Sequence, residues 1–354
     1  MPAATDSPPE EARSSEHFDE AGATHRLRRG LISLGLLLAL VIGLLLAVPG
    51  LHGVAHAVTH MQGGWVAVAV AAEVLSCVGY IVAFLQVFER APIRLGARVA
   101  LSELAFNAAV SLGGAGSVTV GAWLLIDRGA QPARVAERSA VLFLLTSAIN
   151  VITLALIGLA LFVGLLPGPG NPLLSLIPAL VGVGVLVLFL ALPRLSERGA
   201  ARRAPGRLRT VLETTAQSIR DTRGYLFSPD WRTLGAVGYL WFDIGTLLAC
   251  FAATGVNPPL AAVVLAYQIA YLSNLIPIPG GVGILDGSLV GMLVLYGASA
   301  TASAAAVLVY HAISLWIPAM WGTAAFVMLR RSRNKPLVLR PSRAERRQRK
   351  AADG

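Results

Sequence analysis

The stretch SNLIPIPGGVGILD, residues 273–286, decides the fold, because it interrupts an apolar run that is otherwise suited to a membrane helix. A second stretch, FNAAVSLGGAGSVT at 106–119, follows the same pattern, x-N-x5-G-G-x-G. Glycine lets the backbone turn sharply, and proline removes a helix hydrogen bond. The sequence therefore predicts two helices that are broken inside apolar segments.

The composition places these breaks in a membrane protein. Of the 354 residues, 55% are hydrophobic and 14% are charged, and the mean hydropathy is +0.68. A spanning helix takes about 20 residues, so the chain holds several crossings and leaves no room for a sizeable soluble catalytic domain. Motifs of ATPases, zinc proteases and α/β-hydrolases are absent from the sequence, and we predict neither an enzyme nor a cofactor.

Charge and cysteine usage exclude two further classes. The net charge of +10 comes from Arg residues that flank apolar runs, which is typical of cytoplasmic membrane loops and not of nucleic-acid binding. Cys77 and Cys250 both lie inside apolar runs. Neither a disulfide framework nor a thiolate metal site is therefore expected.

Apolar runs of membrane length occur along most of the chain. They cover 31–49, 65–87, 99–126, 139–165, 173–193, 233–254, 258–297 and 302–329.

Arg residues concentrate at alternate connections between these runs and are dense in 194–232. The connections 50–64, 166–172, 255–258 and 297–303 contain no Lys or Arg. By the positive-inside rule, both termini and residues 194–232 are cytoplasmic, and the protein is a multi-pass protein of the plasma membrane.

This assignment gives two runs both of whose ends lie on one side of the membrane. Each half of 99–126 is too short to span comfortably, and 258–297 is broken at its centre. Both runs are interpreted as re-entrant hairpins, with pairs of full crossings as the alternative. We predict an all-α polytopic membrane protein with about six full spanning helices plus two Gly/Pro-broken re-entrant hairpins, or eight or more crossings.

The two hairpins also define an inverted-topology repeat. Each lies between two long helices, in units of about 65–165 and 233–329, and the units run in opposite directions across the membrane. Repeats of this kind form a substrate site at the midplane between discontinuous helices.

The remaining segments complete the predicted domain organisation. Residues 1–25 are acidic and polar and form a disordered tail, and 31–49 is an uncleaved anchor in preference to a signal peptide. Residues 26–330 form the integral membrane domain, with a cytoplasmic amphipathic linker at 194–232. Residues 331–354 form a basic cytoplasmic tail that attracts anionic lipids.

The Gly-rich turns are the candidate substrate site. Each second half-helix starts with unpaired N–H groups and the positive end of its dipole, which together favour an anion, and glycines let the backbone approach a phosphate. Close helix packing is the alternative role of these glycines. The candidate substrate-binding residues are Asn107, Gly113, Gly114, Gly116, Asn274, Pro277, Pro279, Gly280, Gly281, Gly283 and Asp286.

Four acidic residues lie deep in the apolar runs: Glu73, Glu103, Asp243 and Asp286. An ionisable group at the bilayer centre costs at least about 2.5 to 3.5 kcal/mol, so each should face a cavity or a partner. Glu73 and Asp243 occupy similar positions in the helices that precede the two hairpins. Asp286 either caps its half-helix or carries a functional charge.

Two further predictions concern possible proton or ion coupling. Glu103 lies one turn before Asn107, so the two could line one polar path. His311 lies in the middle of the last run and is a candidate proton carrier, with a hydrogen-bonded structural role as the alternative. Glu73, Glu103, Asp243 and His311 are the candidate coupling residues.

The segment SNLIPIPGGVGILDGSLVGMLVLYG at 273–297 resembles the lysylphosphatidylglycerol synthase transmembrane family, whose members are flippase-like integral membrane proteins. GGAGSVTVGAWLLIDRG at 113–129 is similar to the other Gly-rich segment of that family. Members typically carry Glu where this chain has Asp286. They often carry Pro or a charged residue where this chain has Ser111, Ser117 and Thr119. No aminoacyl-transferase domain follows, so the resemblance implies the lipid-translocating portion and not lipid aminoacylation.

The leading hypothesis is a protein that binds an anionic lipid, a phospholipid or a polyprenyl-phosphate carrier, and moves it between leaflets. One alternative is a non-transporting scaffold of an envelope lipid or glycan synthesis complex, and another is an ion-coupled transporter of a small solute. The expected partners are membrane lipids and envelope-biosynthesis enzymes, with no nucleic acid and no metal.

Overall fold

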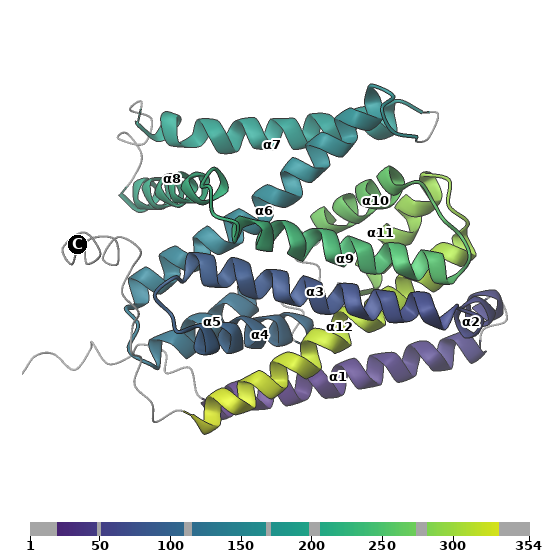
Figure 1. Ribbon diagram of the computed structural model, residues 1–354, viewed down its shortest axis with the longest axis horizontal. Helices are drawn as coiled ribbons and strands as arrows, with labels where there is room; N and C mark the ends of the chain where they lie inside the picture. The colour runs from purple at the N-terminus through teal and green to yellow at the C-terminus, as the bar shows by residue number, and fades with distance from the viewer. Residues whose placement is uncertain are drawn as a thin grey trace, which may run out of the picture.

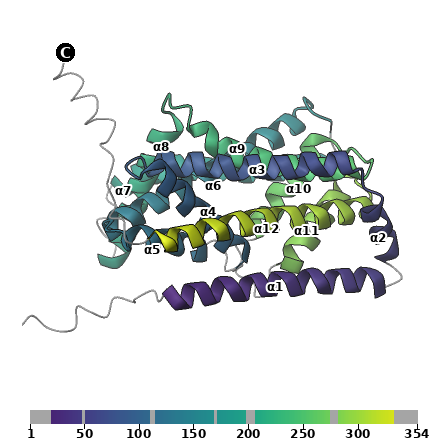
Figure 2. The same cartoon turned by 60° about the horizontal axis from the view of Figure 1, so that its bottom comes forward.

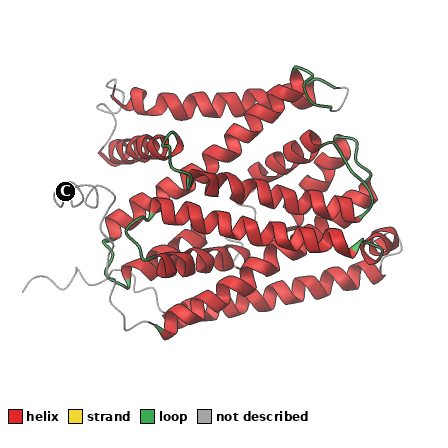
Figure 3. Cartoon of the chain, viewed as in Figure 1, coloured by secondary structure: helices red, strands yellow, loops and turns green. Residues whose placement is uncertain are grey.

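The computed structural model describes residues 20–47, 51–109, 115–167, 171–197, 206–273 and 282–332, and its regular elements there are helices (Figure 3). The prediction of an all-α protein is confirmed. In chain order the helices are α1 Glu20–Ala47, α2 His52–Thr59, α3 Gly63–Val87, α4 Ile93–Ala109, α5 Ala115–Ile126, α6 Pro132–Phe162, α7 Leu173–Glu197, α8 Gly206–Leu226, α9 Thr233–Ala253, α10 Leu260–Ser273, α11 Val282–Leu295 and α12 Ala300–Arg331.

Five helices of the described chain are long and apolar enough to cross a membrane, namely α3, α6, α7, α9 and α12. The protein is therefore a polytopic membrane protein. We predicted about six such helices, and α1 is not among the five. It has 28 residues, but the apolar run predicted at 31–49 continues past the last residue of α1 that the structure describes.

Helix boundaries differ from the prediction in two places. Residues 20–25, which we assigned to the disordered tail, form the first turns of α1. Ala21 and Ala23 are strong helix formers, and the negative charge of Glu20 interacts favourably with the positive end of the helix dipole. The helix therefore extends back from the apolar run. The connection 50–64 contains the short helix α2, on which Val54 is buried.

Two pairs of short helices correspond to the predicted hairpins (Figure 1). Helices α4 and α5 have 17 and 12 residues, and α10 and α11 have 14 each. None reaches the roughly 20 residues that a crossing takes. These lengths favour re-entrant hairpins over pairs of full crossings. The residues between the two helices of each pair, 110–114 and 274–281, lie outside the described residues.

Helices α3 and α9 form an antiparallel pair at the centre of the molecule (Figures 1 and 2). At one end the backbone N–H of Gln62 donates to the carbonyl oxygen of Ala253 over 2.9 Å. At the other end the side-chain amide of Gln86 donates to the hydroxyl of Thr233 over 2.7 Å. The helix that precedes the first hairpin therefore runs opposite to the helix that precedes the second, as an inverted repeat requires.

The two units also exchange contacts in a symmetric way. Helix α4 of the first unit packs along α12 of the second, and α10 of the second unit packs against α6 of the first. Each hairpin thus lies against the last long helix of the other unit. Neither hairpin can be buried without the opposite unit, so the two units form one body.

The first helix of each hairpin is enclosed by protein. All residues from 99 to 106 in α4 and from 261 to 268 in α10 are buried. A helix that ends inside the bilayer leaves backbone groups without partners unless protein or water surrounds it. Their burial on all sides explains how such short helices exist at membrane depth.

The two long helices outside the repeat units, α1 and α7, lie at the outside of the bundle. Figure 1 shows α7 along one edge and α1 along the opposite one. The apolar part of α7 has the smallest buried share of the five long helices. The amphipathic segment forms α8, which packs on α6 and α7. There the guanidinium of Arg138 donates a hydrogen bond to the hydroxyl of Tyr225 and lies over its ring.

The described ends of the membrane domain lie on one face. The guanidinium of Arg330, at the end of α12, donates to the hydroxyl of Thr24 near the start of α1 over 2.9 Å. Arg128, in the connection between α5 and α6, donates to the carbonyl oxygen of Leu329 over 2.9 Å. This face carries the Arg residues of the connections, so it is the face that the positive-inside rule predicts to be cytoplasmic.

Two glycines allow the α3–α9 pair to approach closely. A Cβ atom on Gly79 would lie 2.5 Å from the backbone nitrogen of Tyr239, and a Cβ on Gly235 would lie 2.8 Å from the carbonyl oxygen of Gly79. Both obstacles are backbone atoms, which cannot turn aside. Membrane helices without a hydrophobic driving force between them use small residues in this way.

Gly79→Ala should therefore destabilise the protein by about 1 to 3 kcal/mol, because α3 and α9 must separate to admit the methyl group. The measurement is the Tm of the purified protein in detergent. Gly64→Ala is the matched control, since nothing lies within 4 Å of a Cβ at that position of the same helix. Equal Tm values for the two variants would contradict the close-packing role of Gly79.

The orientation can be tested with single cysteines in a Cys77→Ala/Cys250→Ala background. Leu165, which is 77% exposed after α6, and Gln131, which is exposed before it, lie at opposite ends of one spanning helix. We expect Leu165→Cys to react with an impermeant maleimide in intact cells, and Gln131→Cys to react only after permeabilisation. Labelling of both from the same side would overturn the topology.

Candidate functional site

The site begins with two acidic side chains that face each other between α3 and α9. The carboxyl groups of Glu73 and Asp243 lie close enough to interact, and Glu73 is only 5% exposed. The hydroxyl of Thr246 lies 3.5 Å from a carboxyl oxygen of Glu73. The two residues that we predicted at similar positions in the two repeat units therefore meet in one place.

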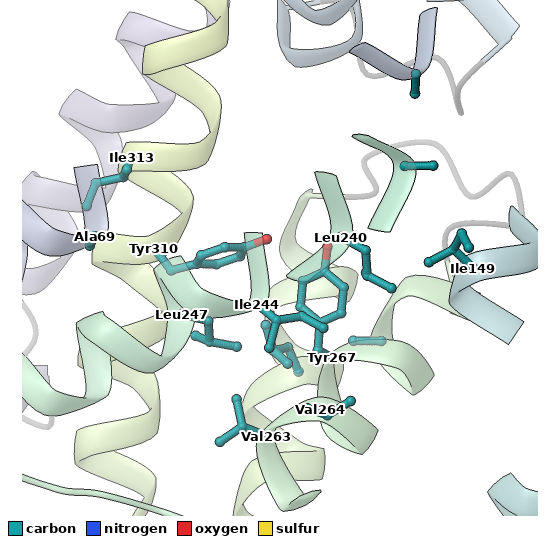
Figure 4. Packing of buried hydrophobic residues seen from close by; sticks show 14 of the residues in the cluster. Ala69, Ile149, Leu240, Ile244, Leu247, Val263, Val264, Tyr267, Tyr310 and Ile313 are labelled. Carbon is teal, nitrogen blue, oxygen red and sulfur yellow. The ribbon is translucent and has the colours of Figure 1, made fainter. Parts of the chain in front are cut away.

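Two tyrosine hydroxyls from the second unit form hydrogen bonds with the carboxyl group of Asp243. The hydroxyl of Tyr267, on α10, donates to one carboxyl oxygen, and the hydroxyl of Tyr310, on α12, lies 3.1 Å from both oxygens. Figure 4 shows these two hydroxyls directed toward the same region from different helices. The hydrogen bonds of Asp243, on α9, therefore connect this helix to α10 and α12.

Glu103 forms the counterpart in the first hairpin. It is 3% exposed and accepts a hydrogen bond from the hydroxyl of Tyr80, on α3, over 2.7 Å. A Cβ atom on Gly121 of α5 would lie 1.6 Å from its carboxyl oxygen. The carboxyl group therefore occupies the space that a side chain on α5 would fill, and it lies between α3, α4 and α5.

Aromatic contacts connect these two carboxyl sites. The ring centroid of Tyr80 lies 5.1 Å from that of Tyr239 on α9. The ring of Tyr271 lies 6.4 Å from that of Tyr267 and is close enough to Tyr80 and Tyr239 to interact with both. We call the whole set the tyrosine–carboxyl row. Its members are Glu103, Tyr80, Tyr239, Tyr271, Tyr267, Asp243, Tyr310 and Glu73.

The row places hydroxyl and carboxyl groups among apolar helices, where lipid offers no hydrogen-bond partner. Phenols both donate and accept hydrogen bonds, and carboxyl groups accept them or carry a proton. Ionisable groups inside a membrane mark substrate pathways or proton relays. The row joins the first hairpin to the second through the interface of the two units. In the part of the chain that the structure describes, no group of three or more His, Cys, Asp or Glu side chains is placed to hold a metal ion.

The predicted turn residues mostly lie outside the described residues. These are Gly113, Gly114, Asn274, Pro277, Pro279, Gly280 and Gly281. Gly116 and Gly283 lie in the first turns of α5 and α11. The backbone of Asp286 belongs to α11, and its side chain lies outside the description.

Two other candidates have described side chains. Asn107 is exposed, whereas Glu103, one turn earlier, is buried, and the polar path for the pair stays a prediction. His311 is half-buried, with its ring centroid 5.0 Å from that of Tyr310, and it interacts with Asp243. His311 therefore lies beside the row.

The tyrosines were not among the site residues predicted from the sequence. Five of the seven tyrosines of the chain belong to the row. The sequence could have indicated them, because these tyrosines lie inside apolar runs, where a hydroxyl group needs a hydrogen-bond partner. The spacing of four residues between Tyr267 and Tyr271 also places them on one helix face.

Comparison with known proteins gives two matches. The profile of a family described as "Lysylphosphatidylglycerol synthase TM region" matches residues 31–322. A curated relative, a UPF0104 membrane protein of Methanothermobacter thermautotrophicus (strain Delta H), is 33% identical over 93 residues. This alignment covers 26% of this chain and 26% of that relative. The chain thus spans about a quarter of the length of the relative it matches.

The hydrogen bond between Tyr267 and Asp243 can be tested by a double-mutant cycle. Tyr267→Phe should lower stability by about 1 to 3 kcal/mol in the native background, because it removes a donor from a buried carboxyl group. The loss should be smaller by at least about 0.5 kcal/mol in Asp243→Asn. The measurement is the Tm of the four purified proteins.

Tyr296→Phe is the matched control, because the hydroxyl of Tyr296 donates instead to the carbonyl oxygen of Leu174. Its effect should add to that of Asp243→Asn without coupling. Additive effects for Tyr267→Phe as well would contradict a direct bond.

Proposed function

The chain belongs to the lysylphosphatidylglycerol synthase transmembrane family, and from this membership together with the site we propose that it binds an anionic lipid and moves it between leaflets. The lipid is a phospholipid or a polyprenyl-phosphate carrier. The observation that carries the proposal is the tyrosine–carboxyl row, which connects two oppositely oriented hairpins through the interface of the two units.

Three features of the molecule support a lipid substrate. The half-helices α5 and α11 follow Gly-rich stretches of sequence, and the N–H groups and dipole at a helix start favour a phosphate. Phenols of the row supply further donors to an anionic headgroup. The outer surfaces of the long helices are apolar, as the exposed side chains of α7 illustrate, so acyl chains can remain in the bilayer while the headgroup moves.

The carboxyl groups give the site its dependence on protons. An ionised Asp243 or Glu73 repels an anionic headgroup in a medium of low dielectric, whereas a protonated carboxyl group does not. Entry of the headgroup is therefore favoured when the row holds protons, and loss of those protons favours release. Glu73, Glu103, Asp243 and His311 are the groups through which this coupling would act.

We propose transport without covalent chemistry, so the protein acts as a carrier and not as an enzyme. It works in the cell membrane with both termini in the cytoplasm, in keeping with the Arg residues on that face. Enzymes of envelope lipid or glycan synthesis are the proposed partners, because they produce or consume such lipids.

Translocation is measured in proteoliposomes that contain a fluorescent phosphatidylglycerol and a quencher specific for the outer leaflet. The native protein should move the lipid at a rate that depends on pH. Asp243→Asn should reduce the rate at least about tenfold or remove its pH dependence, because an amide cannot exchange a proton. Tyr296→Phe, outside the row, should transport normally.

Two results would overturn the proposal. A native protein that moves no lipid would favour the scaffold role, and a native rate and pH profile in Asp243→Asn would remove the row from transport. The same assay distinguishes the roles of Asp286. Loss of transport in Asp286→Asn with retention in Asp286→Glu supports a charge, whereas a native profile in Asp286→Asn leaves a helix cap.

A further inference from the structure

A groove separates α1 from α12 near the Arg-rich face. Its volume is about 320 Å³. The lining side chains come from these two helices alone and include no Asp or Glu. They are Thr24, Leu27, Arg28, Leu31, Ile32, Thr323, Phe326, Val327 and Arg330.

The groove exists because α1 contacts the bundle at separate points. Further along α1, Leu34 packs with Ala108 of α4 and Ala319 of α12 in a small apolar cluster. At the Arg-rich end, the hydrogen bond between Arg330 and Thr24 joins α12 to α1. The groove runs from the Leu34 cluster to the bond between Arg330 and Thr24, and these last two residues form part of its lining.

The chemistry of the groove changes along its length. Ile32 and Val327 make part of an apolar wall and are 52% and 40% exposed. Arg28 and Arg330 stand at the end that belongs to the Arg-rich face. Cationic side chains at the level of the lipid headgroups attract anionic lipids, and an apolar wall below them accepts hydrocarbon.

A buried hydroxyl adds a third feature. The Oγ1 atom of Thr323 is shielded from solvent and has no hydrogen-bond partner among the described residues. Thr323 lies about two helical turns deeper than Arg330 on the same helix. A buried hydroxyl usually has a partner, and the ester carbonyl of a lipid below its phosphate is an acceptor of the right kind.

We propose that this groove binds an anionic glycerophospholipid of the adjacent leaflet as a resident ligand that is not transported. The phosphate lies at Arg28 and Arg330, an ester carbonyl accepts from Thr323, and the start of one acyl chain lies along Leu31 and Val327. A volume of 320 Å³ is at the lower end of the roughly 300 to 1,000 Å³ of small-molecule sites. It therefore holds this part of a lipid, with the rest of the chains in the bilayer.

The site is separate from the proposed transport pathway. Its residues belong to α1 and α12, and none is a member of the tyrosine–carboxyl row. The inference therefore does not rest on the proposed function. The groove does touch the first hairpin indirectly, because the ring of Phe326 packs edge-on against Phe106 of α4, with centroids 5.4 Å apart. A lipid in the groove would thus brace α1 and support the helix pair α4–α12.

Charge complementarity favours a lipid over a protein partner. The wall is apolar, and its cationic end belongs to the Arg-rich face, where the positive-inside rule predicts the phosphates of the cytoplasmic leaflet. A second copy of this chain would bring its own Arg residues to the same level and would be repelled.

The experiment is native mass spectrometry of the full-length protein, delipidated in detergent and titrated with phosphatidylglycerol. Arg28→Gln/Arg330→Gln should weaken binding of one lipid at least about tenfold, since each Arg near the membrane surface contributes to attraction of an anionic lipid. Arg94→Gln/Arg134→Gln is the matched control, because it removes the same charge from exposed positions that do not line the groove. The control should bind as the native protein does.

A second variant addresses the possibility that loss of Arg330 detaches α1. Val327→Trp fills the apolar wall but leaves both arginines in place, and it should also abolish binding of that one lipid. Three results would overturn the proposal. They are native binding in both groove variants, equal loss in the Arg94→Gln/Arg134→Gln control, and equally tight binding of water-soluble glycerol phosphate, which would indicate an anion site that needs no acyl chain.

Discussion

The structure depends on one constraint, namely that backbone N–H and C=O groups inside a lipid bilayer need partners. Helices α4 and α10 are too short to cross, so each ends where lipid offers no hydrogen bond. Both are surrounded by protein along residues 99–106 and 261–268. Part of that protein comes from the opposite unit, namely α12 for α4 and α6 for α10, and the rest comes from helices of the same unit. The inverted arrangement therefore contributes to the burial of both hairpins.

The same exchange of contacts creates the polar row. Because the units are antiparallel, equivalent positions on α3 and α9 meet at their interface, and the carboxyl groups of Glu73 and Asp243 come together there. A pair of carboxyl groups is tolerated inside the membrane only when donors surround it. The phenols of Tyr267 and Tyr310 supply those donors from α10 and α12, the elements that the exchange brings to this place.

The sequence was sufficient to predict the short helices and the repeat, but not the side-chain contacts between helices. The division of each hairpin run into two short helices follows from local glycine and proline patterns. The similar positions of Glu73 and Asp243 follow from the repeat. The bond between Tyr80 and Glu103 depends on how α3 and α4 are rotated about their axes, which only packing decides. Spacing placed Glu103 with Asn107 on one helix face, but it cannot say that Glu103 is buried while Asn107 is exposed. The prediction missed the extension of α1 to Glu20. It assigned 20–25 to the tail from the polar composition of residues 1–25, whereas a helix that starts in the apolar run can continue into polar residues.

The proposed function combines two opposite electrostatic tendencies. The starts of α5 and α11 favour an anion, whereas the carboxyl groups of the row oppose one whenever they are ionised. A site with both features cannot bind an anionic headgroup and remain fully ionised, because each unscreened repulsion is large where the dielectric is low. Occupation of the site and protonation of the row must therefore be linked, and linkage of this kind is reciprocal. Under the proposed function, a proton gradient across the membrane can then bias the direction in which the headgroup moves.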